Sequence, residues 1–440
     1  MNIPRLNLPR VVIVGGRFAG LIVAKRLKKS RLQVIMIDKN NYHTFQPLLY
    51  QVATSGLEPD SITYPIRKIF NEYENFHFRI ASVQRIIPDK NTLVTNKGEI
   101  NYDYLVLTTG AQTNYFGLDD VKKLSMPMKT IREALNLRSL ILQNLEDALM
   151  VNDLKDREKL MNYVIVGGGP TGVELAGALA ELKKSVLPKD YPDLDLRNMN
   201  IHLIESGPRL LGTMSAESSS FAMKFLKDME VNVWVNTRVT GYDGDEVKTN
   251  SPKDFPAKTL IWTAGVKGAP VKGIPIINPA GRFIVDKFNR VSGHNNIFAA
   301  GDVASMISKE YPKGHPMLAT VAIKQGEILG RNIDSLIKDK PLKSFNYNNW
   351  GTMATIGRNK AVVDLTKFRF QGTFAWFVWT LVHLMLLVGF RNKVVTLINW
   401  VWSYFNYDKG VRLIIRPFKR KKLRILEDQK NPSLVVSQSL

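Results

Sequence analysis

The chain has 440 residues, of which 45% are apolar, so it is long enough for two or three domains with substantial cores. It contains no cysteine, which excludes disulfides, thiolate metal sites, iron–sulfur clusters and dithiol redox chemistry, and its six histidines show no metal-binding spacing. A net charge of +22 favours an anionic partner, either a nucleic acid or an anionic membrane surface.

The N-terminal part of the chain predicts a strand, a glycine turn and a helix. Val11–Gly20 reads VVIVGGRFAG and leads into the helical stretch Leu21–Lys28, and the next strand, Val34–Asp38, ends in an acid. Tyr104–Gly110 is a further buried strand that ends in a turn. No apolar segment of a secretory signal peptide precedes the first strand, so we expect a cytoplasmic setting.

The same design returns in the middle of the chain, after a predicted helix over Thr130–Asp147. Tyr163–Gly172 reads YVIVGGGPTG, and its following strand, Ile201–Glu205, again ends in an acid. Leu260–Gly265 and Asn296–Asp302 are further strands that end in turns. Alternating strands and helices predict an α/β fold with two Rossmann-like domains, each a doubly wound parallel sheet.

These elements divide the chain into four predicted segments. Residues 1–118 form the first part of the first dinucleotide-binding domain, and residues 119–290 form the second domain with its connecting helix. The first domain resumes over residues 291–350. Residues 351–440 form a C-terminal, membrane-associating helical region.

Each glycine turn has the pattern of a dinucleotide-binding site. The first glycine makes the tight turn, the second admits the pyrophosphate, and the third lets helix and strand pack closely. The second unit fills all three places, with Gly167, Gly169 and Gly172. In the first unit Gly15 and Gly20 fill the outer places, but Arg17 stands in the middle, where it either crowds the pyrophosphate or pairs with it. A structural turn without a ligand is the alternative for either motif alone.

Acidic residues mark the expected ligand contacts. Asp38 and Glu205 end strands beside the turns, where a carboxylate binds the adenosine ribose and repels a 2′-phosphate; either is otherwise an exposed strand-end acid. We therefore assign NAD(H) to the second site and FAD to the first. Asp302 is a candidate for the ribityl chain or a helix N-cap. Glu174 either complements the helix dipole or lies where nicotinamide and flavin meet.

The C-terminal region has the composition of a membrane interface. Phe374–Phe390 is almost uninterrupted apolar sequence, but its 17 residues are at the short limit for a bilayer span. An amphipathic helix follows, with apolar residues at helical spacing: Val394, Leu397, Ile398, Val401, Trp402 and Phe405. The basic run Lys419–Arg424 comes next. We expect this region to lie on an anionic membrane rather than to cross it or bind nucleic acid; a soluble core or a dimer contact is the alternative.

Together these stretches resemble the type II NADH dehydrogenases, single-subunit, non-pumping NADH:quinone oxidoreductases of the two-dinucleotide-binding-domain flavoprotein superfamily. The resemblance runs nearly end to end, through residues 38–59, 102–117, 167–182, 203–211, 260–266, 296–304 and 354–365 and the C-terminal aromatic stretches. It implies FAD in the first domain, NADH in the second, and a membrane quinone, either menaquinone or ubiquinone, reached through a tunnel that opens to the membrane.

The resemblance also implies individual contacts. Those for flavin fall on Gly15, Gly16, Gly20, Asp38, Gly301 and Asp302. Those for NADH fall on Gly167, Gly169, Gly172 and Glu205, with Glu174 near the nicotinamide. We also assign to cofactor binding Arg17, Gln51, Thr109, Gly110 and Gly265.

The chain departs from the family at the quinone site. The segment Ala319–Gln325 reads ATVAIKQ, where the family pattern is Ala-Gln-x-Ala-x-Gln-Gln, so Thr320 and Lys324 replace the first two glutamines. A lysine near the flavin would stabilise a reduced flavin or a quinone oxyanion. The candidate catalytic residues are therefore Glu174, Lys324 and Gln325.

The predicted function is transfer of a hydride from NADH to FAD, followed by transfer of two electrons to a membrane quinone, without proton pumping. We expect a peripheral, monotopic protein on the cytoplasmic face of the cell membrane. The alternatives are a degenerate, non-catalytic NADH-sensing paralogue at the membrane and a flavoprotein reductase with another acceptor. The identity of the quinone and the formation of a homodimer stay open.

Overall fold

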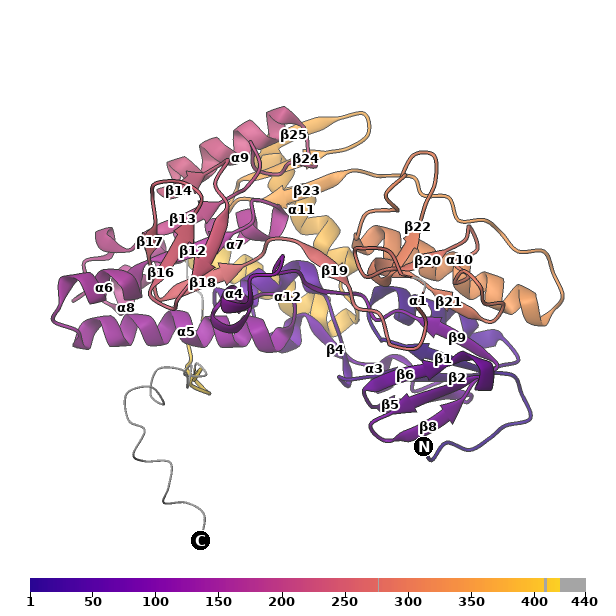
Figure 1. Cartoon of the computed structure of the whole chain (residues 1–440). Coiled ribbons are helices and arrows are strands. Elements are labelled where there is room, and N and C mark those ends of the chain that lie inside the picture. Colours follow the sequence, from indigo (N-terminus) through magenta and orange to yellow (C-terminus); the bar gives the residue numbers. More distant parts are fainter. Residues whose placement is uncertain (276, 407–409, 420–440) are drawn as a thin grey trace, which may run out of the picture.

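The computed structural model describes residues 1–275, 277–406 and 410–419; of the predicted basic run Lys419–Arg424, all but Lys419 lies outside the described residues. The chain forms two lobes, each built on a five-stranded sheet (Figure 1). The strand order is β21-β9-β1-β2-β5 in the first sheet and β11-β18-β12-β13-β14 in the second. Every neighbouring pair in both sheets is parallel, as the alternation of strands and helices predicts.

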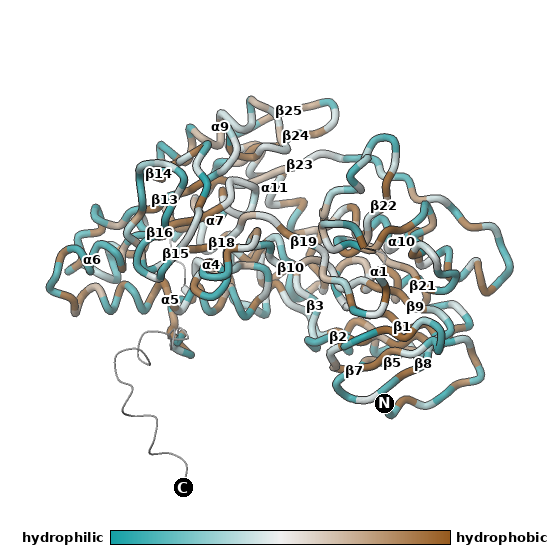
Figure 2. Tube along the Cα trace, viewed as in Figure 1, coloured by the Kyte–Doolittle hydropathy of each residue, from teal (hydrophilic) through white to brown (hydrophobic). Residues whose placement is uncertain are grey.

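The first sheet is buried on both faces, which its runs of valine and isoleucine require. Its strands are β1 (Arg10–Val14), β2 (Gln33–Asp38), β5 (Phe76–Ile80), β9 (Tyr104–Leu107) and β21 (Ile297–Ala299). Figure 2 shows the hydrophobic character of β1 and β9. Helices α1 (Phe18–Arg26) and α10 (Ala319–Ile337) pack against each other in this lobe.

The second sheet repeats the arrangement around the second glycine turn. Its strands are β11 (Met126–Pro127), β12 (Tyr163–Val166), β13 (Ile201–Ile204), β14 (Val231–Trp234) and β18 (Thr259–Trp262). The helices of this lobe are α4 (Asp119–Leu124), α5 (Ile131–Met150), α6 (Leu154–Met161), α7 (Pro170–Ser185), α8 (Leu187–Asp190) and α9 (Ala216–Asp228). Helix α5 begins with a capping box, in which Thr130 and Glu133 satisfy each other's backbone N–H groups.

The chain returns to the first lobe earlier than the predicted boundary at residue 290. Directly after β18, β19 (Val266–Gly268) pairs antiparallel with β10 (Ala111–Thr113), and β20 (Phe283–Val285) pairs with β22 (Ala304–Met306). Val271 and the β20 side chains pack in the core of the first lobe. The chain therefore passes from the second lobe to the first directly after β18, because these apolar side chains are buried in the core of the first lobe.

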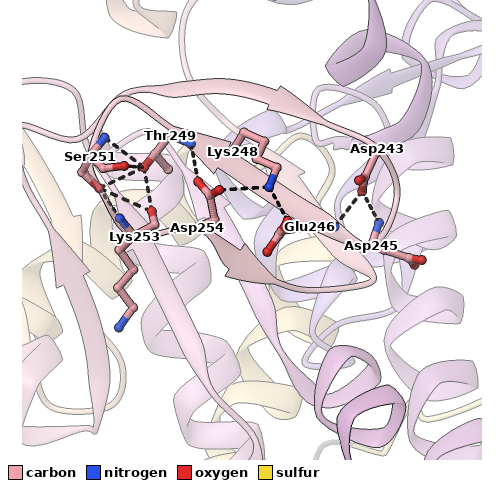
Figure 3. A network of polar contacts seen from close by, with 8 residues as sticks. All are labelled: Asp243, Asp245, Glu246, Lys248, Thr249, Ser251, Lys253 and Asp254. Carbon is pink, nitrogen blue, oxygen red and sulfur yellow. Dashed lines mark hydrogen bonds and ion pairs between the residues drawn. The ribbon is translucent and has the colours of Figure 1, made fainter.

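Smaller antiparallel sheets lie outside the two parallel sheets. One pairs β3 (Tyr42–Thr44) with β4 (Thr63–Pro65), and a second joins β6 (Val83–Ile87), β7 (Thr92–Thr95) and β8 (Gly98–Asn101). A third joins β15 (Val239–Tyr242), β16 (Glu246–Thr249) and β17 (Phe255–Pro256). In the last of these, Lys248 bridges Glu246 and Asp254, and Asp254 accepts a hydrogen bond from the Thr249 amide (Figure 3). Such exposed ion pairs hold the hairpin with little net stabilisation.

The C-terminal region is a three-stranded sheet followed by two helices that lie between the lobes (Figure 1). The elements are β23 (Thr352–Thr355), β24 (Ala361–Asp364), β25 (Arg369–Gly372), α11 (Thr373–Leu386) and α12 (Phe390–Asn406). The predicted apolar run 374–390 is thus one helix and a turn at Gly389, whose φ is 89°. Within the described part of the chain, no helix has the length and apolarity needed to cross a membrane.

Candidate active site

The first glycine turn is closed too tightly for any side chain at its outer positions. Gly15 has a φ of 106°, and a Cβ on it would lie 2.4 Å from the carbonyl oxygen of Thr108. A Cβ on Gly20 would lie 2.0 Å from the carbonyl oxygen of Gly15. Both positions therefore require glycine, one for its backbone conformation and one for the close contact of helix and strand.

The second glycine turn has the same construction. Gly167 has a φ of 109°, and a Cβ on Gly172 would lie 1.9 Å from the Gly167 carbonyl oxygen. Each turn leads from the carboxyl end of a strand, β1 or β12, into a helix, α1 or α7. The N-terminus of each helix therefore lies at the carboxyl end of its strand. The positive ends of two helix dipoles are thus available to phosphate groups.

The middle position distinguishes the two turns. Gly169 and Arg17 both have ordinary negative φ values, −74° and −82°, so neither conformation requires glycine. A Cβ on Gly169 would meet no protein atom within 4 Å, so this glycine leaves an open cradle before the helix. Arg17 reaches over Gly110, and its Nη1 is buried with no hydrogen-bond partner among the described residues. An unsatisfied guanidinium N–H at this position fits the diphosphate of FAD.

The two strand-end acids are fixed to their turns by backbone amides. Asp38 Oδ2 accepts a hydrogen bond from the Gly16 N–H at 2.6 Å, and Glu205 Oε2 accepts one from the Gly168 N–H at 2.6 Å. The second oxygen of each carboxylate accepts a backbone N–H two residues further along the chain. Each carboxylate is therefore held as a hydrogen-bond acceptor at the edge of its turn.

A cavity of about 530 Å³ lies between the turns. Predicted site residues from both lobes line it: Arg17, Gly110, Gly169, Glu174, Gly265, Gly301 and Asp302. Gly15, Gly16, Gly20, Gly167, Gly172, Asp38 and Glu205 shape the turns without lining this cavity. The structure thus brings the two predicted sites to one space, although they are far apart in the sequence.

Lys129 is a lining residue that the sequence analysis missed. Its Nζ lies 4.0 Å from the Asp302 carboxylate, and burial lowers the pKa of Lys129 while Asp302 opposes that shift. The residue precedes the capping box of α5, and its proximity to Asp302 depends on contact between the lobes. No local pattern in the sequence could have revealed it.

Four predicted residues lie elsewhere than expected. Lys324, which we expect near the flavin, is half-exposed, pairs with Glu327 and does not line this cavity. The reason is the rotation of α10, which turns its Gly326 and Gly330 face toward α1. Gln325 is buried, and its Oε1 accepts the Gly301 N–H at 2.7 Å, so it positions that turn rather than facing a substrate.

Thr109 and Gln51 also lie outside the lining of this cavity. The Thr109 hydroxyl donates to the carbonyl oxygen of Ala269 at 2.7 Å, which ties the turn after β9 to the segment that follows β19. Gln51 lines a neighbouring cavity of about 130 Å³, where its Oε1 accepts a hydrogen bond from the Trp400 indole at 2.7 Å. Thr320, which replaces a family glutamine, does line the larger cavity, and its hydroxyl lies 3.0 Å from that of Tyr347.

Glu174 lies in the walls of both cavities. It is carried by the first turns of α7 and is covered by Thr355 of β23 and Trp379 of α11. Burial raises the pKa of Glu174 to about 8, and the Thr355 amide and the Trp379 indole oppose this shift. The carboxyl group is therefore mostly protonated at neutral pH, which makes it a potential proton donor.

Comparisons with known proteins agree with this geometry. The sequence model of the pyridine nucleotide-disulphide oxidoreductase family matches residues 9–326, and that of the NDH2 C-terminal domain matches residues 350–406. The type II NADH:quinone oxidoreductase NdhA of Mycobacterium tuberculosis is 33% identical, over 98% of this chain and 94% of the relative. The solved structure of NDH2 from Plasmodium falciparum in complex with NADH, 21% identical, has a TM-score of 0.84 over 93% of this chain and 100% of that chain. This chain therefore belongs to the pyridine nucleotide-disulphide oxidoreductase family and, within it, to the type II NADH:quinone oxidoreductases.

Proposed function

We propose that this chain is an FAD-dependent NADH:quinone oxidoreductase that works at a membrane surface without pumping protons. The observation that carries the proposal is the cavity that both glycine turns border, with Glu174 in its wall. Leu386 of α11 lines the same cavity and is 41% exposed, so the cavity reaches the apolar C-terminal helices. A nucleotide and a lipid-soluble acceptor can therefore share one space.

The first turn has the donor and acceptor groups that FAD requires. Asp38 would accept hydrogen bonds from the ribose, Arg17 would pair with the diphosphate, and Asp302 would bind the chain that leads to the flavin ring. When bound, FAD supplies a hydride acceptor and a two-electron donor. Gln325 supports this site through the Gly301 turn.

The second turn is suited to NADH. The open space at Gly169 admits the pyrophosphate, and the N-terminus of α7 faces it. Glu205 would accept hydrogen bonds from the ribose hydroxyl groups and repel a 2′-phosphate, so this site would prefer NADH to NADPH. The nicotinamide end would reach the cavity beside Glu174.

Reduction of a quinone to a quinol by NADH takes up one proton besides the hydrogen that NADH supplies, and the protein must deliver this proton inside the cavity. Glu174 is mostly protonated at neutral pH, so it can donate one proton to a quinone oxygen and recover it afterwards. Its position between the two cavities gives it access to both.

The C-terminal helices present apolar surface on the outside of the molecule. The exposed side chains are Phe374, Phe377, Leu381, Met385, Phe390, Val394, Leu397, Ile398, Val401, Trp402 and Phe405. Many exposed apolar side chains on helices that border the cavity, in a chain with a net charge of +22, suit an anionic lipid surface. We place that surface on the cytoplasmic face, where a protein without cysteine meets a reducing compartment and NADH.

Flotation with lipid vesicles tests the membrane assignment. One variant replaces Ile398, Trp402 and Phe405 together by serine; all three side chains are at least 60% exposed. This variant should no longer float with vesicles that contain anionic phospholipid. Replacement of Met150 and Leu154 by serine is the control. These side chains, at the end of α5 and the start of α6, are more exposed, at 83% and 75%, and this variant should float like the unmodified protein. Equal flotation of both variants would contradict the assignment, and loss of a dimer would identify the surface as a contact between copies.

Steady-state oxidation of NADH tests the activity. The purified protein with FAD should oxidise NADH with short-chain ubiquinone or menaquinone and only slowly with NADPH. A reductase for another acceptor would reduce ferricyanide but neither quinone. A non-catalytic NADH-sensing paralogue would bind NADH without oxidising it.

A further inference from the structure

His383 is a half-buried histidine in the wall of the cavity, and the proposed reaction assigns no role to it. It lies on α11, and Val382, His383 and Leu386 line the cavity on one face of that helix. Leu381 and Met385 are exposed on the opposite face, at 61% and 63%. His383 therefore lies between the apolar outer surface and the interior of the cavity.

The ring of His383 is fixed from three directions. It stacks on Trp379 with ring centroids 4.0 Å apart, and Phe45 meets it edge to face at 6.1 Å. Its Nδ1 lies 2.8 Å from the carbonyl oxygen of Trp379. A carbonyl oxygen can only accept, so Nδ1 carries a hydrogen and donates it.

This hydrogen bond determines what the other ring nitrogen can do. Burial lowers the pKa of His383 to about 4, so the ring is neutral at pH 7 and carries one N–H. Because Nδ1 holds that hydrogen, Nε2 is an acceptor with a free lone pair. Within residues 1–275, 277–406 and 410–419, Nε2 has no hydrogen-bond partner.

We propose that His383 is a quinol-binding residue, whose Nε2 accepts a hydrogen bond from a hydroxyl group of the quinol at the membrane side of the cavity. This inference rests on the proposed NADH:quinone oxidoreductase activity and deepens it. The oxygens of a quinone only accept hydrogen bonds, whereas the hydroxyls of a quinol also donate them. A neutral acceptor at this place therefore favours the reduced over the oxidised form.

Trp379 links this acceptor to the proton donor of the same cavity. The indole ring stacks on His383, and its N–H interacts with the Glu174 carboxyl. The cavity thus has a protonated acid and a neutral acceptor on its wall. A quinone that takes a proton at the acid becomes a ligand that can donate to His383.

Two substitutions separate the two nitrogens of the ring. The amide nitrogen of asparagine in His383→Asn reproduces the Nδ1 donor to Trp379 and leaves nothing at the Nε2 position. The longer side chain in His383→Gln can place an amide oxygen near the Nε2 position. His383→Phe keeps the stacking on Trp379 and removes both nitrogens, so it serves if the asparagine variant does not fold.

The test compares quinol with quinone. Calorimetric titration of oxidised, FAD-loaded protein with a short-chain quinol, without oxygen, should show a dissociation constant raised about tenfold in His383→Asn or His383→Phe. His383→Gln should stay within about threefold of the unmodified protein. Product inhibition by the quinol should weaken in parallel, and KM for the quinone should change less than about twofold.

The opposite pattern would overturn the inference. Unchanged quinol affinity in the asparagine and phenylalanine variants, or equal weakening of quinol and quinone, would show that His383 only shapes the cavity. Failure of the proposed function would give a different result from failure of the His383 inference, because the unmodified protein itself would then reduce no quinone. The rate of flavin reduction by NADH is the internal control and should be the same in all variants.

Discussion

Replacement of Glu174 by glutamine tests whether this carboxyl group is held neutral in the cavity wall. Glutamine has nearly the same shape as the protonated acid and cannot ionise. Burial raises the pKa of Glu174 from an ordinary 4.5 to about 8, so the folded protein holds a proton that the unfolded chain releases between these two values. The side chain is buried, so its shift converts to stability without a large correction for solvent screening.

The sign and size of the effect follow from proton linkage. The folded state binds more protons than the unfolded state between pH 4.5 and 8, so stability falls as the pH rises through this window. One pH unit corresponds to about 1.4 kcal/mol, so the loss reaches roughly 3 kcal/mol at pH 7. Glu174→Gln removes this term, and its advantage over the unmodified protein should grow from pH 5 to pH 8 and then level off.

Thermal unfolding of both proteins across pH 5 to 9 measures this difference. All other ionisable groups are common to the two proteins, so their contributions cancel. For a chain of this length, a gain of 1 kcal/mol corresponds to about 1 °C in the melting temperature. A constant difference in melting temperature at every pH would refute a buried, neutral Glu174. The same variant should slow reoxidation of the flavin by quinone about 100-fold and leave its reduction by NADH unchanged.

The other predictions concern three charged residues. Arg17→Gly should weaken FAD binding about tenfold, because it removes the buried guanidinium N–H. Flavin fluorescence after dialysis measures the loss of FAD, and tighter binding would show that Arg17 obstructs the site. Glu205→Gln should lower the NADH-to-NADPH ratio of kcat/KM by about tenfold, and an unchanged ratio would contradict its role at the ribose. Lys324→Gln should leave quinone kinetics within about twofold, because Lys324 is half-exposed and paired with Glu327; a larger effect confined to the quinone step would restore it to the site.

The glycine turns and strand-end acids could be predicted because their requirements are local. The φ of Gly15 and the contact between Gly20 and the Gly15 carbonyl are set within a few residues, as are their equivalents in the second turn. Alternation of apolar strands and helices then determines the parallel sheets. Asp38 follows from its place at the end of a strand.

The cavity wall could not be predicted in the same way, because it depends on how separate elements pack. The side of α10 that faces the cavity is set by the contact of Gly326 and Gly330 with α1, and this turns Lys324 outward. The raised pKa of Glu174 results from its burial against elements that follow far along the chain, among them β23 and α11. The tautomer of His383 follows from a single carbonyl contact within α11 that no sequence pattern indicates.

The most direct test of the account follows the colour of the flavin without oxygen. The protein purified with FAD should lose its visible flavin absorbance on addition of one equivalent of NADH and regain it when a short-chain quinone is added. Both changes should occur within one catalytic turnover time. A protein that takes up no FAD, or whose reduced flavin is not reoxidised by either ubiquinone or menaquinone analogues, would contradict it.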